Sequence, residues 1–539
     1  MLLSDHDLRQ IDEMYLKSLG SENLIGVSIR LLNDLKEARD RLNQNPGNSS
    51  RPPTSREPWV VAQIKEEGEG EELEVEESEE EIALEKVDHE GVSSAEDKAE
   101  DKVSVAEVSV TEEKKEPQKK GSASGEGRKP GKQKGASGCG RTQKLPVTNE
   151  VIHRAHKCAA CGRELGEEAE FIPRTGHYVI EIDLGSETEP GIGVINTKHI
   201  YGDTICSCGH ATRTQPHRCQ KESEWDVELT QWHIVGPLLM ALICCLALRM
   251  RLSRPRIREL LSEWIGLNLS VGTINQCIHE AGRAVAPVED QLIEEVIKSD
   301  LLHVDETSWK EKGKPFWSWV FCTATVVLYV IGFRSKETIE DLLGDAFMGW
   351  LMSDGYQVYR KYKNRLRCWA HLLRKARGLY ESLDKEAQPF GEKTLEVLNT
   401  LMEAIYQARL GPGENLVDKY QKLLEQFRLL CETYRNAKHE KTRVLAREFL
   451  NDWEAIFLVL LYPHLPLTNN EAEQALRHWV ILRKLCYGTR TKQGSKAFTL
   501  LASVIDTCRK RKISPWQYLS KTISLRRQGQ DALPIPSAL

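Results

Sequence analysis

Two aspartates in the sequence each follow an apolar segment that is typical of a buried strand. In "LLHVDETSW" (301–309) the strand is expected to stop at Asp305 and Glu306, and in "MGWLMSDGYQVY" (348–359) the apolar run ends at Asp354. A solvated turn would explain either acid alone. Two carboxylates that lie side by side repel each other, and proteins keep this arrangement where a cation neutralises it. Metal chemistry therefore depends on whether the fold brings Asp305 and Asp354 together.

The segment "PLTNNEAEQALRHWVILRK" (466–484) supplies a third carboxylate. Asn469 or Asn470 is expected to cap a helix whose first turns hold Glu471 and Glu473. Residues two positions apart point to different faces of a helix, so no more than one of these glutamates can face the aspartates. The spacing alone leaves open which of the two it is.

The segments between the two aspartates are expected to bring them together. "KPFWSWVFCT" (314–323) and "ATVVLYVIGF" (324–333) are strongly β-prone, so an antiparallel meander of three strands is the simplest arrangement for this region. "SKETIEDLLGDAF" (335–347) then predicts a helix. A right-handed crossover helix returns the chain to the same sheet. The fourth strand is therefore expected to lie parallel to the first, with Asp305 and Asp354 side by side.

Such a group of carboxylates suits a hard divalent cation. Mg²⁺ and Mn²⁺ prefer oxygen ligands and keep further positions for water or phosphate. Two such ions about 3.5–4 Å apart can activate an attacking oxygen and stabilise a leaving oxygen in an in-line phosphoryl displacement. The acids thus predict metal-dependent phosphodiester chemistry.

The charge of the chain is unevenly distributed. The 539 residues are too many for one hydrophobic core, and their net charge is −6. Residues 61–117 hold 22 acidic and 6 basic side chains, a net charge of −16, which leaves +10 for the remainder. Because the acidic segment has few apolar residues to bury, we expect it to be disordered. The basic remainder favours an anionic partner such as nucleic acid.

The sequence indicates a reducing compartment. The 14 cysteines are scattered, and the start "MLLSDHDLRQ" lacks the basic and apolar pattern of a secretory signal. We therefore expect the protein in the cytoplasm. The apolar run at 234–248 is shorter than the roughly 20 residues of a membrane helix. It predicts a buried core helix, and no membrane partner is expected.

The first 145 residues are expected to form a helix and a linker. Within 1–45, Leu24, Leu31, Leu35 and Leu42 lie on one stripe of a helix. A short coiled coil and a helix packed on its own chain both fit this stripe. The linker at 46–145 is acidic first and basic later, and its basic part either contacts phosphates or serves as a flexible tether.

The segment 146–222 has the cysteine pairs of a zinc-binding module. Cys158-x-x-Cys161 has standard spacing, whereas Cys206-x-Cys208 has one intervening residue. Structural Zn²⁺ takes four thiolate or imidazole ligands. We expect Cys158, Cys161 and Cys206 to bind it, and the fourth ligand is one of four residues: Cys208, His210, His217 or Cys219. Free cysteines in a small reduced domain are the alternative.

The region 223–295 is expected to be helical. In "RIRELLSEWIGLNLSVGTINQCIHEAGRAV" (256–285) an amphipathic helix breaks at Gly266, and Ser270 is a suitable N-cap for a second helix. Two helices joined by a short turn that contains glycine match a DNA-binding helix-turn-helix. An ordinary helical hairpin has the same spacing.

Taken together, these motifs are similar to those of the transposases of the insertion sequence 66 family. The likeness extends over nearly the whole chain and includes "HVDETSW", "SDGYQVY", "CWAHLLRKA" (368–376), "NNEAEQALR" and "SPWQYL" (514–519). It implies a multidomain protein whose DDE-type catalytic domain, at 296–525, has a mixed α+β and α/β ribonuclease H-like fold. The likeness also implies a helical insertion at about 378–462 and a C-terminal tail at 526–539.

The resemblance also implies the roles of the acids. The pattern Asn-Asn-x-Ala-Glu places the third acid after Ala472, so the catalytic and Mg²⁺- or Mn²⁺-binding triad would be Asp305, Asp354 and Glu473. Two features depart from the family pattern, namely the acidic stretch at 61–117 and the tight spacing of Cys206 and Cys208.

Basic residues flank the expected triad. The segment 355–377 has eight Lys or Arg and no acid, and 474–527 has thirteen Lys or Arg and one acid. These residues either form solvated faces or hold DNA phosphates. We expect DNA contacts from Arg374, Lys375, Arg477, Arg483, Lys484 and Arg490. Core packing is the expected role of Trp369 and Trp479, and His371 is either a buried structural residue or a residue that positions substrate.

The resemblance implies a transposase that hydrolyses a phosphodiester at the ends of a mobile element and joins the freed 3′-hydroxyl to target DNA. The implied partners are the terminal repeats and the target DNA, further copies of the chain in a synaptic complex, and small accessory proteins. The implied location is the cytoplasm of a bacterium or archaeon, in association with the nucleoid. A catalytically silent DNA-binding regulator derived from a transposase is the alternative. A plain nuclease of the same fold is a third reading. Three intact acids favour the enzyme.

Overall fold

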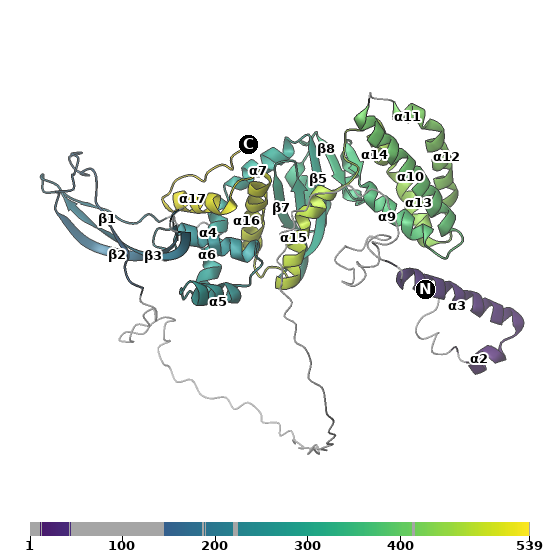
Figure 1. Ribbon diagram of the computed structural model, residues 1–539, viewed down its shortest axis with the longest axis horizontal. Helices are drawn as coiled ribbons and strands as arrows, with labels where there is room; N and C mark the ends of the chain where they lie inside the picture. Colours follow the sequence, from purple (N-terminus) through teal and green to yellow (C-terminus); the bar gives the residue numbers. More distant parts are fainter. Residues whose placement is uncertain are drawn as a thin grey trace, which may run out of the picture. The chain divides into compact units, whose positions relative to one another are not determined.

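The computed structural model describes residues 11, 13–42, 44, 145–185, 188, 190–218, 225–411 and 415–537. The chain divides into two units, Met1–Glu57 with Gln143–Leu539, and Pro58–Thr142. The second unit, and with it most of the expected linker, lies outside the described residues, as does Cys219. The described part of the chain is a mixture of α-helices and two β-sheets (Figure 1).

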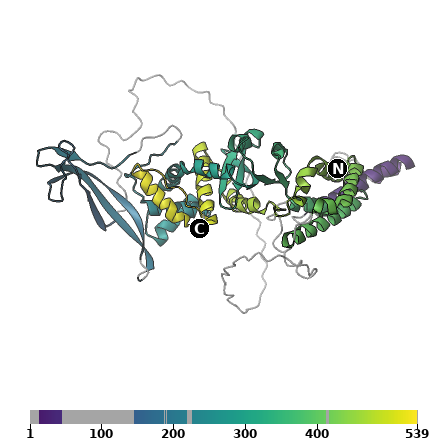
Figure 2. The same ribbon diagram turned by 90° about the horizontal axis from the view of Figure 1, so that it is seen from above.

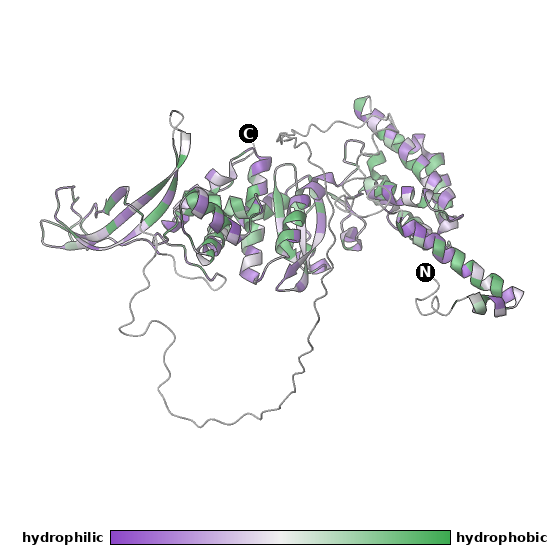
Figure 3. Ribbon diagram, turned by 60° about the horizontal axis from the view of Figure 1, so that its bottom comes forward, coloured by the Kyte–Doolittle hydropathy of each residue, from purple (hydrophilic) through white to green (hydrophobic). Residues whose placement is uncertain are grey.

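The N-terminal part has two helices, α2 (Glu13–Ser18) and α3 (Ser21–Leu42). Hydrophobic and hydrophilic residues alternate along α3, the long helix beside the N-terminal marker in Figure 3. Leu35 and Leu42 of the expected stripe are exposed, and so are Ile25 and Leu32 next to it. Near the end of α3, Asp40 accepts a hydrogen bond from the Ser382 hydroxyl.

The segment with the cysteine pairs forms a sheet of β1 (Asn149–His153), β2 (Phe171–Gly185), β3 (Pro190–Ile205) and β4 (Ala211–Arg213). Strand β3 pairs parallel with β1 and antiparallel with β2 and β4. Figure 2 shows β2 and β3 as a long twisted ribbon. Phe171 at the start of β2 pairs with Thr204 near the end of β3. The segments that carry the two cysteine pairs, before β2 and after β3, therefore lie at the same end of the sheet.

Four helices follow: α4 (Pro237–Leu248), α5 (Arg254–Trp264), α6 (Val271–Val285) and α7 (Val288–Ile297). Helix α4 is the buried core helix that the apolar run predicts. The side chain of Ser270 caps α6 by accepting a hydrogen bond from the Thr273 amide (3.0 Å), as expected. Within the described residues, no helix is long and apolar enough to span a membrane.

The central sheet contains β5 (Leu301–Glu311), β6 (Lys314–Cys322), β7 (Val327–Gly332), β8 (Trp350–Ser353) and β9 (Arg365–Arg367), in the order β7-β6-β5-β8-β9. Strands β5, β6 and β7 form the expected antiparallel meander. After helix α8 (Lys336–Leu343), β8 pairs parallel with β5, which confirms the predicted return of the chain.

One expectation about this sheet is wrong. Strand β5 does not stop at Asp305 and Glu306 but continues to Glu311, because β6 pairs with it along its whole second half, from Asp305–Val320 to Glu311–Lys314. Asp305 is therefore fixed within a strand rather than on a turn.

The helices that lie between β9 and α15 in the sequence pack around a separate hydrophobic core. They are α9 (Trp369–Tyr380), α10 (Ala387–Leu410), α11 (Leu416–Lys419), α12 (Gln421–Tyr434), α13 (Glu440–Asn451) and α14 (Trp453–Phe457). Short 3-10 helices lie at Gln357–Lys361 and Leu458–Leu460. The chain then returns to the central sheet with α15 (Asn470–Cys486) and α16 (Lys492–Lys510), followed by α17 (Pro515–Arg527).

Candidate active site

Asp305 and Asp354 lie at matching levels of neighbouring parallel strands. The register pairs His303 of β5 with Met352 of β8. Asp305 and Asp354 each follow these paired residues by two positions. Burial, followed by the charges of Asp354, Glu306 and Glu473, raises the pKa of Asp305 well above its usual value. The carboxylates predicted from the sequence to converge are therefore close enough to repel one another.

Asn469 fixes the start of α15 against β5. Its side-chain amide donates a hydrogen bond to the Val304 carbonyl oxygen (2.9 Å), and its Oδ1 lies 3.2 Å from His303 Nδ1. Its backbone amide donates to the Cys368 thiol (3.3 Å). Asn469 is at the N-cap position, but its side chain forms no capping hydrogen bond, which corrects the expected role. Instead, it holds the first turn of α15 beside the strand that carries Asp305.

The two glutamates of this turn point to different surroundings, as their spacing predicts. Glu473 Oε1 lies 3.2 Å from His371 Nε2 and 3.9 Å from Arg374 Nη2, and the contact with His371 lowers the pKa of Glu473. Glu471 instead binds Lys510 at 2.6 Å. Only Glu473 of the two acts electrostatically on Asp305. The two glutamates thus differ in their surroundings, and it is Glu473 whose charge contributes to the raised pKa of Asp305.

Glu306, the acid next to Asp305 in the sequence, has a buried side chain beside the site. Its side chain is 2% exposed and accepts hydrogen bonds from the Tyr359 hydroxyl (2.8 Å) and from Arg334 (2.8 Å). Burial and the nearby Asp354 carboxylate raise the pKa of Glu306. Because these partners already use both of its oxygens, Glu306 supports the strand arrangement around Asp354.

A buried cluster of ion pairs lies next to the residue that follows Asp354. Asp452 of the helical region accepts hydrogen bonds from Arg360, Arg365 and Arg367, and Glu448 binds Arg367 and Lys375. The cluster joins β9 to α13. The sequence showed the excess of basic residues in this segment, but it could not show that acids from α13 neutralise some of them.

Gly355, the residue after Asp354, packs closely against this ion cluster. A Cβ at Gly355 would lie 2.7 Å from Arg367 Nη2 and 2.9 Å from Glu448 Oε1. Both groups are held by ion pairs, so Gly355→Ala is expected to displace the Asp354 loop and to lower DNA cleavage about ten-fold, or ~1.4 kcal/mol in the barrier. Gly411→Ala is the matched control, since its Cβ would meet no atom closer than 3.7 Å. Equal cleavage rates for the two variants, measured in single turnovers, would refute this role.

The basic residues expected to contact DNA occupy different kinds of position. Arg374 faces Glu473 in the site. Lys375 is bound to Glu448 (2.8 Å) in the ion cluster, and Arg483 donates hydrogen bonds to Thr307 (2.8 Å). Lys375 and Arg483 therefore hold elements of the fold together.

The other three of these residues are exposed: Arg477, Lys484 and Arg490. Trp369 and Trp479 are 1% and 0% exposed and pack in hydrophobic cores, which confirms the expected role of both.

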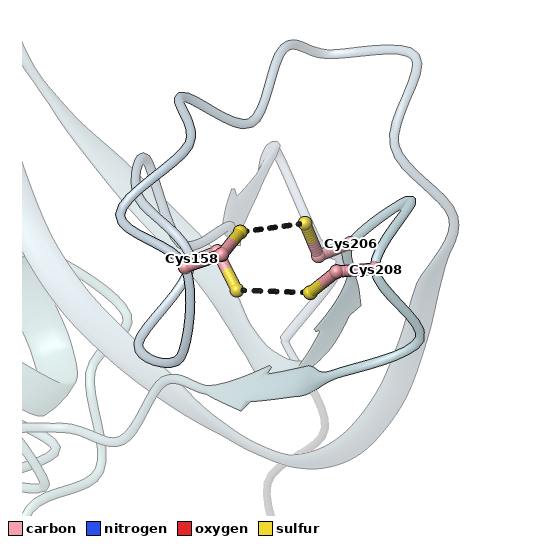
Figure 4. A group of neighbouring side chains, drawn as sticks. Cys158, Cys206 and Cys208 are labelled. Atoms are coloured by element: carbon pink, nitrogen blue, oxygen red, sulfur yellow. Dashed lines mark hydrogen bonds between the residues drawn. The ribbon is translucent and has the colours of Figure 1, made fainter.

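The four cysteines of the two predicted pairs converge in the β-sheet module (Figure 4). Sγ atoms of Cys158 and Cys208, and those of Cys161 and Cys206, are each 3.7 Å apart. In a tetrahedral site with Zn–S bonds of about 2.3 Å, the sulfur atoms are about 3.8 Å apart. The arrangement therefore fits a Zn²⁺ ion with Cys208 as the fourth ligand.

The other proposed ligands of that ion lie elsewhere. His217 Nδ1 is 3.0 Å from the Arg527 carbonyl oxygen, and His210 is not part of the cysteine group. Outside this group, the described residues contain one further set with ligand atoms within 4.8 Å of one another, Cys368, His371 and Glu473. There the Cys368 thiol is buried and accepts the Asn469 amide, and burial raises its pKa, so it is a structural residue.

Comparison with known proteins identifies one family. Residues 233–497 match the family model described as Transposase IS66 family. This segment extends from the start of the helical region to α16 and includes Asp305, Asp354 and Glu473.

Three relatives come from Sinorhizobium fredii. The uncharacterized protein y4jO is 25% identical over 212 residues, which cover 39% of this chain and 62% of that protein. The uncharacterized proteins y4qI and y4hP are each 22% identical over 311 and 300 residues, covering 51% and 48% of this chain. The matches span 56% and 54% of those two proteins. The chain thus spans less than two thirds of the length of each of these relatives.

Proposed function

Since residues 233–497 belong to the transposase IS66 family, we propose that this protein is a DNA transposase that hydrolyses a phosphodiester at the ends of an insertion sequence and joins the freed 3′-hydroxyl to target DNA. The observation that carries this proposal is the placement of Asp305 and Asp354 at matching levels of neighbouring parallel strands, with Glu473 of α15 adding to the negative charge that acts on Asp305. A purely structural role would not require acidic residues placed so that their charges raise the pKa of the neighbouring Asp305.

The sheet order supports a ribonuclease H-like catalytic core. Three antiparallel strands are followed by a helix and a fourth strand that lies parallel to the first, and a fifth strand completes the sheet beside it. In this proposal the helices α10 to α14 form an insertion between β9 and α15. That arrangement lets Glu473, more than 100 residues after Asp354, return to the same edge of the sheet.

We propose that Asp305, Asp354 and Glu473 bind divalent Mg²⁺ or Mn²⁺. Asp305 and Asp354 lie on neighbouring parallel strands, and burial together with the charges of Asp354, Glu306 and Glu473 raises the pKa of Asp305, which supports a site that a divalent cation would neutralise. When bound, such ions supply charge stabilisation to the attacking and leaving oxygens of a phosphoryl displacement. His371 and Arg374 hold Glu473 in place.

The remaining modules are proposed to bind DNA. Exposed Arg477, Lys484 and Arg490 offer positive charge to phosphates near the site. The helix pair α5–α6 and the cysteine module would recognise the terminal repeats, with Zn²⁺ on Cys158, Cys161, Cys206 and Cys208. Synapsis of two ends implies a homo-oligomer, and the exposed leucines of α3 are suited to such an assembly. We also propose that small accessory proteins of the same element are partners of this protein.

Removal of one cysteine tests the zinc assignment. Cys161→Ser is expected to lower the zinc content from one ion per chain to near zero, because structural Zn²⁺ binds through all four thiolates and contributes directly to folding free energy. The zinc content of purified protein, measured by atomic emission, checks this. Cys245→Ser, on α4 and outside the group, is the control and should retain the ion. Full zinc content in Cys161→Ser would contradict the site.

The experiment that tests the proposed function uses DNA that carries the element's own terminal repeats. A transposase cleaves at the repeat ends and joins them to a second DNA. A silent regulator binds the repeats without cleaving them, and a plain nuclease cleaves without regard to the repeats. The three intact acids favour the first outcome over the second.

A further inference from the structure

A cavity of about 680 Å³ lies between the helix pair α5–α6 and the turn that joins α15 to α16. Figure 1 shows these helices beside one another, and α6 packs directly on α16. The volume falls within the range of roughly 300–1,000 Å³ that is usual for sites of small organic groups. Its walls come from five separate parts of the chain: Asp226 and Val227 before α4, the α4–α5 corner, α6, the end of β5, and the α15–α16 region.

The exposed side of α6 faces this cavity. Asn275 and Gln276 line it, whereas the opposite side of α6 is buried in the core. Both amides can donate and accept hydrogen bonds. The polar side of the second helix of the pair therefore borders a cavity within its own chain.

The cavity has an apolar wall and a basic rim. Leu252, Leu482 and Phe498 contribute to the wall. Arg251, Arg254 and Arg490 contribute to the lining, against a single acid, Asp226. None of these three arginines forms an ion pair or side-chain hydrogen bond with the part of the chain that the structure describes.

The environment of Arg254 favours an anion. This guanidinium is half-buried, and its burial lowers its pKa. A cation taken out of water without an acidic partner costs free energy that an anionic ligand would recover. Phosphate is the anion whose geometry arginine matches best, through paired hydrogen bonds.

The cavity is within reach of the three acids. Trp309 lines it and follows Asp305 by four residues on β5, which is about 13 Å of strand. Leu482 lines it and follows Glu473 by nine residues on α15, which is about 14 Å of helix. At about 3.4 Å per nucleotide of stacked strand, this separation corresponds to roughly four nucleotides.

We propose that the cavity binds one unpaired nucleotide of a DNA strand, with its phosphate on Arg251, Arg254 and Arg490 and its base against the apolar wall beside Asn275 and Gln276. This inference rests on the proposed function, since it takes DNA as the partner, and it adds a site at which a base leaves the duplex about four nucleotides from the bond that is cleaved. An apolar pocket suits any base, because stacking and burial are tolerant of sequence.

The test uses full-length protein without added Mg²⁺ and a single-stranded oligonucleotide that carries the fluorescent base 2-aminopurine. Affinity comes from anisotropy of an end label, and base burial comes from the change in 2-aminopurine emission. Arg251→Ala with Arg254→Ala is expected to weaken binding at least ten-fold at fixed salt and to abolish the emission change. Arg428→Ala with Arg435→Ala removes the same charge from exposed positions near α12 and should weaken binding less than two-fold.

A second variant tests the space in the cavity independently of the positive charge of its arginines. Asn275→Trp fills the cavity at an exposed helix position and leaves every arginine in place. It is expected to abolish the emission change, with thermal unfolding close to that of the unaltered protein. Persistence of the emission change in Asn275→Trp, or equal loss of affinity in the two arginine pairs, would overturn the inference.

Two further results distinguish this inference from the proposed function. Displacement of the oligonucleotide by a free mononucleotide at a similar concentration would show a small-molecule site and overturn the assignment to a DNA strand. Normal cleavage of repeat ends by the Arg251 and Arg254 variant, with unchanged binding, would overturn the cavity site alone. Absence of both DNA binding and cleavage in the unaltered protein would overturn the proposed function together with the cavity site.

Discussion

Replacement of Asp305 or Asp354 by asparagine is expected to lower strand cleavage by at least about a thousand-fold, or ~4 kcal/mol in the activation free energy. Asparagine keeps the shape of the side chain but removes one negative charge from a group that lies on adjacent parallel strands. In the proposed mechanism, the remaining acids would then neutralise the divalent ions incompletely, and the attacking water would be poorly activated. Single-turnover cleavage of DNA with terminal repeats measures the effect.

The same variants should still bind the element ends. Phosphate contacts come from arginine and lysine side chains and do not depend on the acids. Asp345→Asn is the matched control, because Asp345 is exposed at the turn after α8 and lies outside both strands. Cleavage by Asp305→Asn at more than a tenth of the unaltered rate would rule out the proposed catalytic role of this acid.

Asn469→Ala is expected to lower cleavage about a hundred-fold and to raise the Mg²⁺ concentration that gives half-maximal activity. The substitution removes the hydrogen bonds to Val304 and His303 that fix the start of α15 on β5. It leaves a buried carbonyl without a donor, at a cost of about 1–3 kcal/mol. Glu473 lies one helical turn further along α15, so its position relative to Asp305 becomes less well defined.

The adjacent residue provides the control for this effect. Asn470 is exposed, whereas Asn469 is 1% exposed. Asn470→Ala should therefore leave both the cleavage rate and the Mg²⁺ dependence unchanged. A merely structural loss in Asn469→Ala would lower the amount of active protein without moving the Mg²⁺ dependence, and that outcome would argue against a positioning role.

The order of the central strands could be predicted because it follows from local patterns. Three β-prone segments with almost nothing between them must form a meander, and the helix at 336–343 returns the chain to the same sheet. The different faces of Glu471 and Glu473 also follow from helical periodicity. These rules act over short distances along the chain, and they were sufficient to place two aspartates together.

Features that depend on distant segments could not be predicted in the same way. The end of β5 was placed too early, because the sequence does not show that β6 pairs with it as far as Glu311. Asn469 looked like a helix cap, yet its partners His303 and Val304 lie on a strand more than 160 residues earlier. The acids that bind Arg367 are Glu448 of α13 and Asp452 directly after this helix, and no pattern near Arg367 indicates them.

The comparison of Glu473→Gln with Glu471→Gln tests the central claim most directly. Both substitutions remove one charge from the same turn of α15, but Glu473 acts on Asp305 while Glu471 binds Lys510. In single-turnover cleavage of repeat ends at saturating Mg²⁺, we predict at least a thousand-fold loss for Glu473→Gln and less than a three-fold loss for Glu471→Gln. An active Glu473→Gln enzyme beside an inactive Glu471→Gln enzyme would contradict the proposed site.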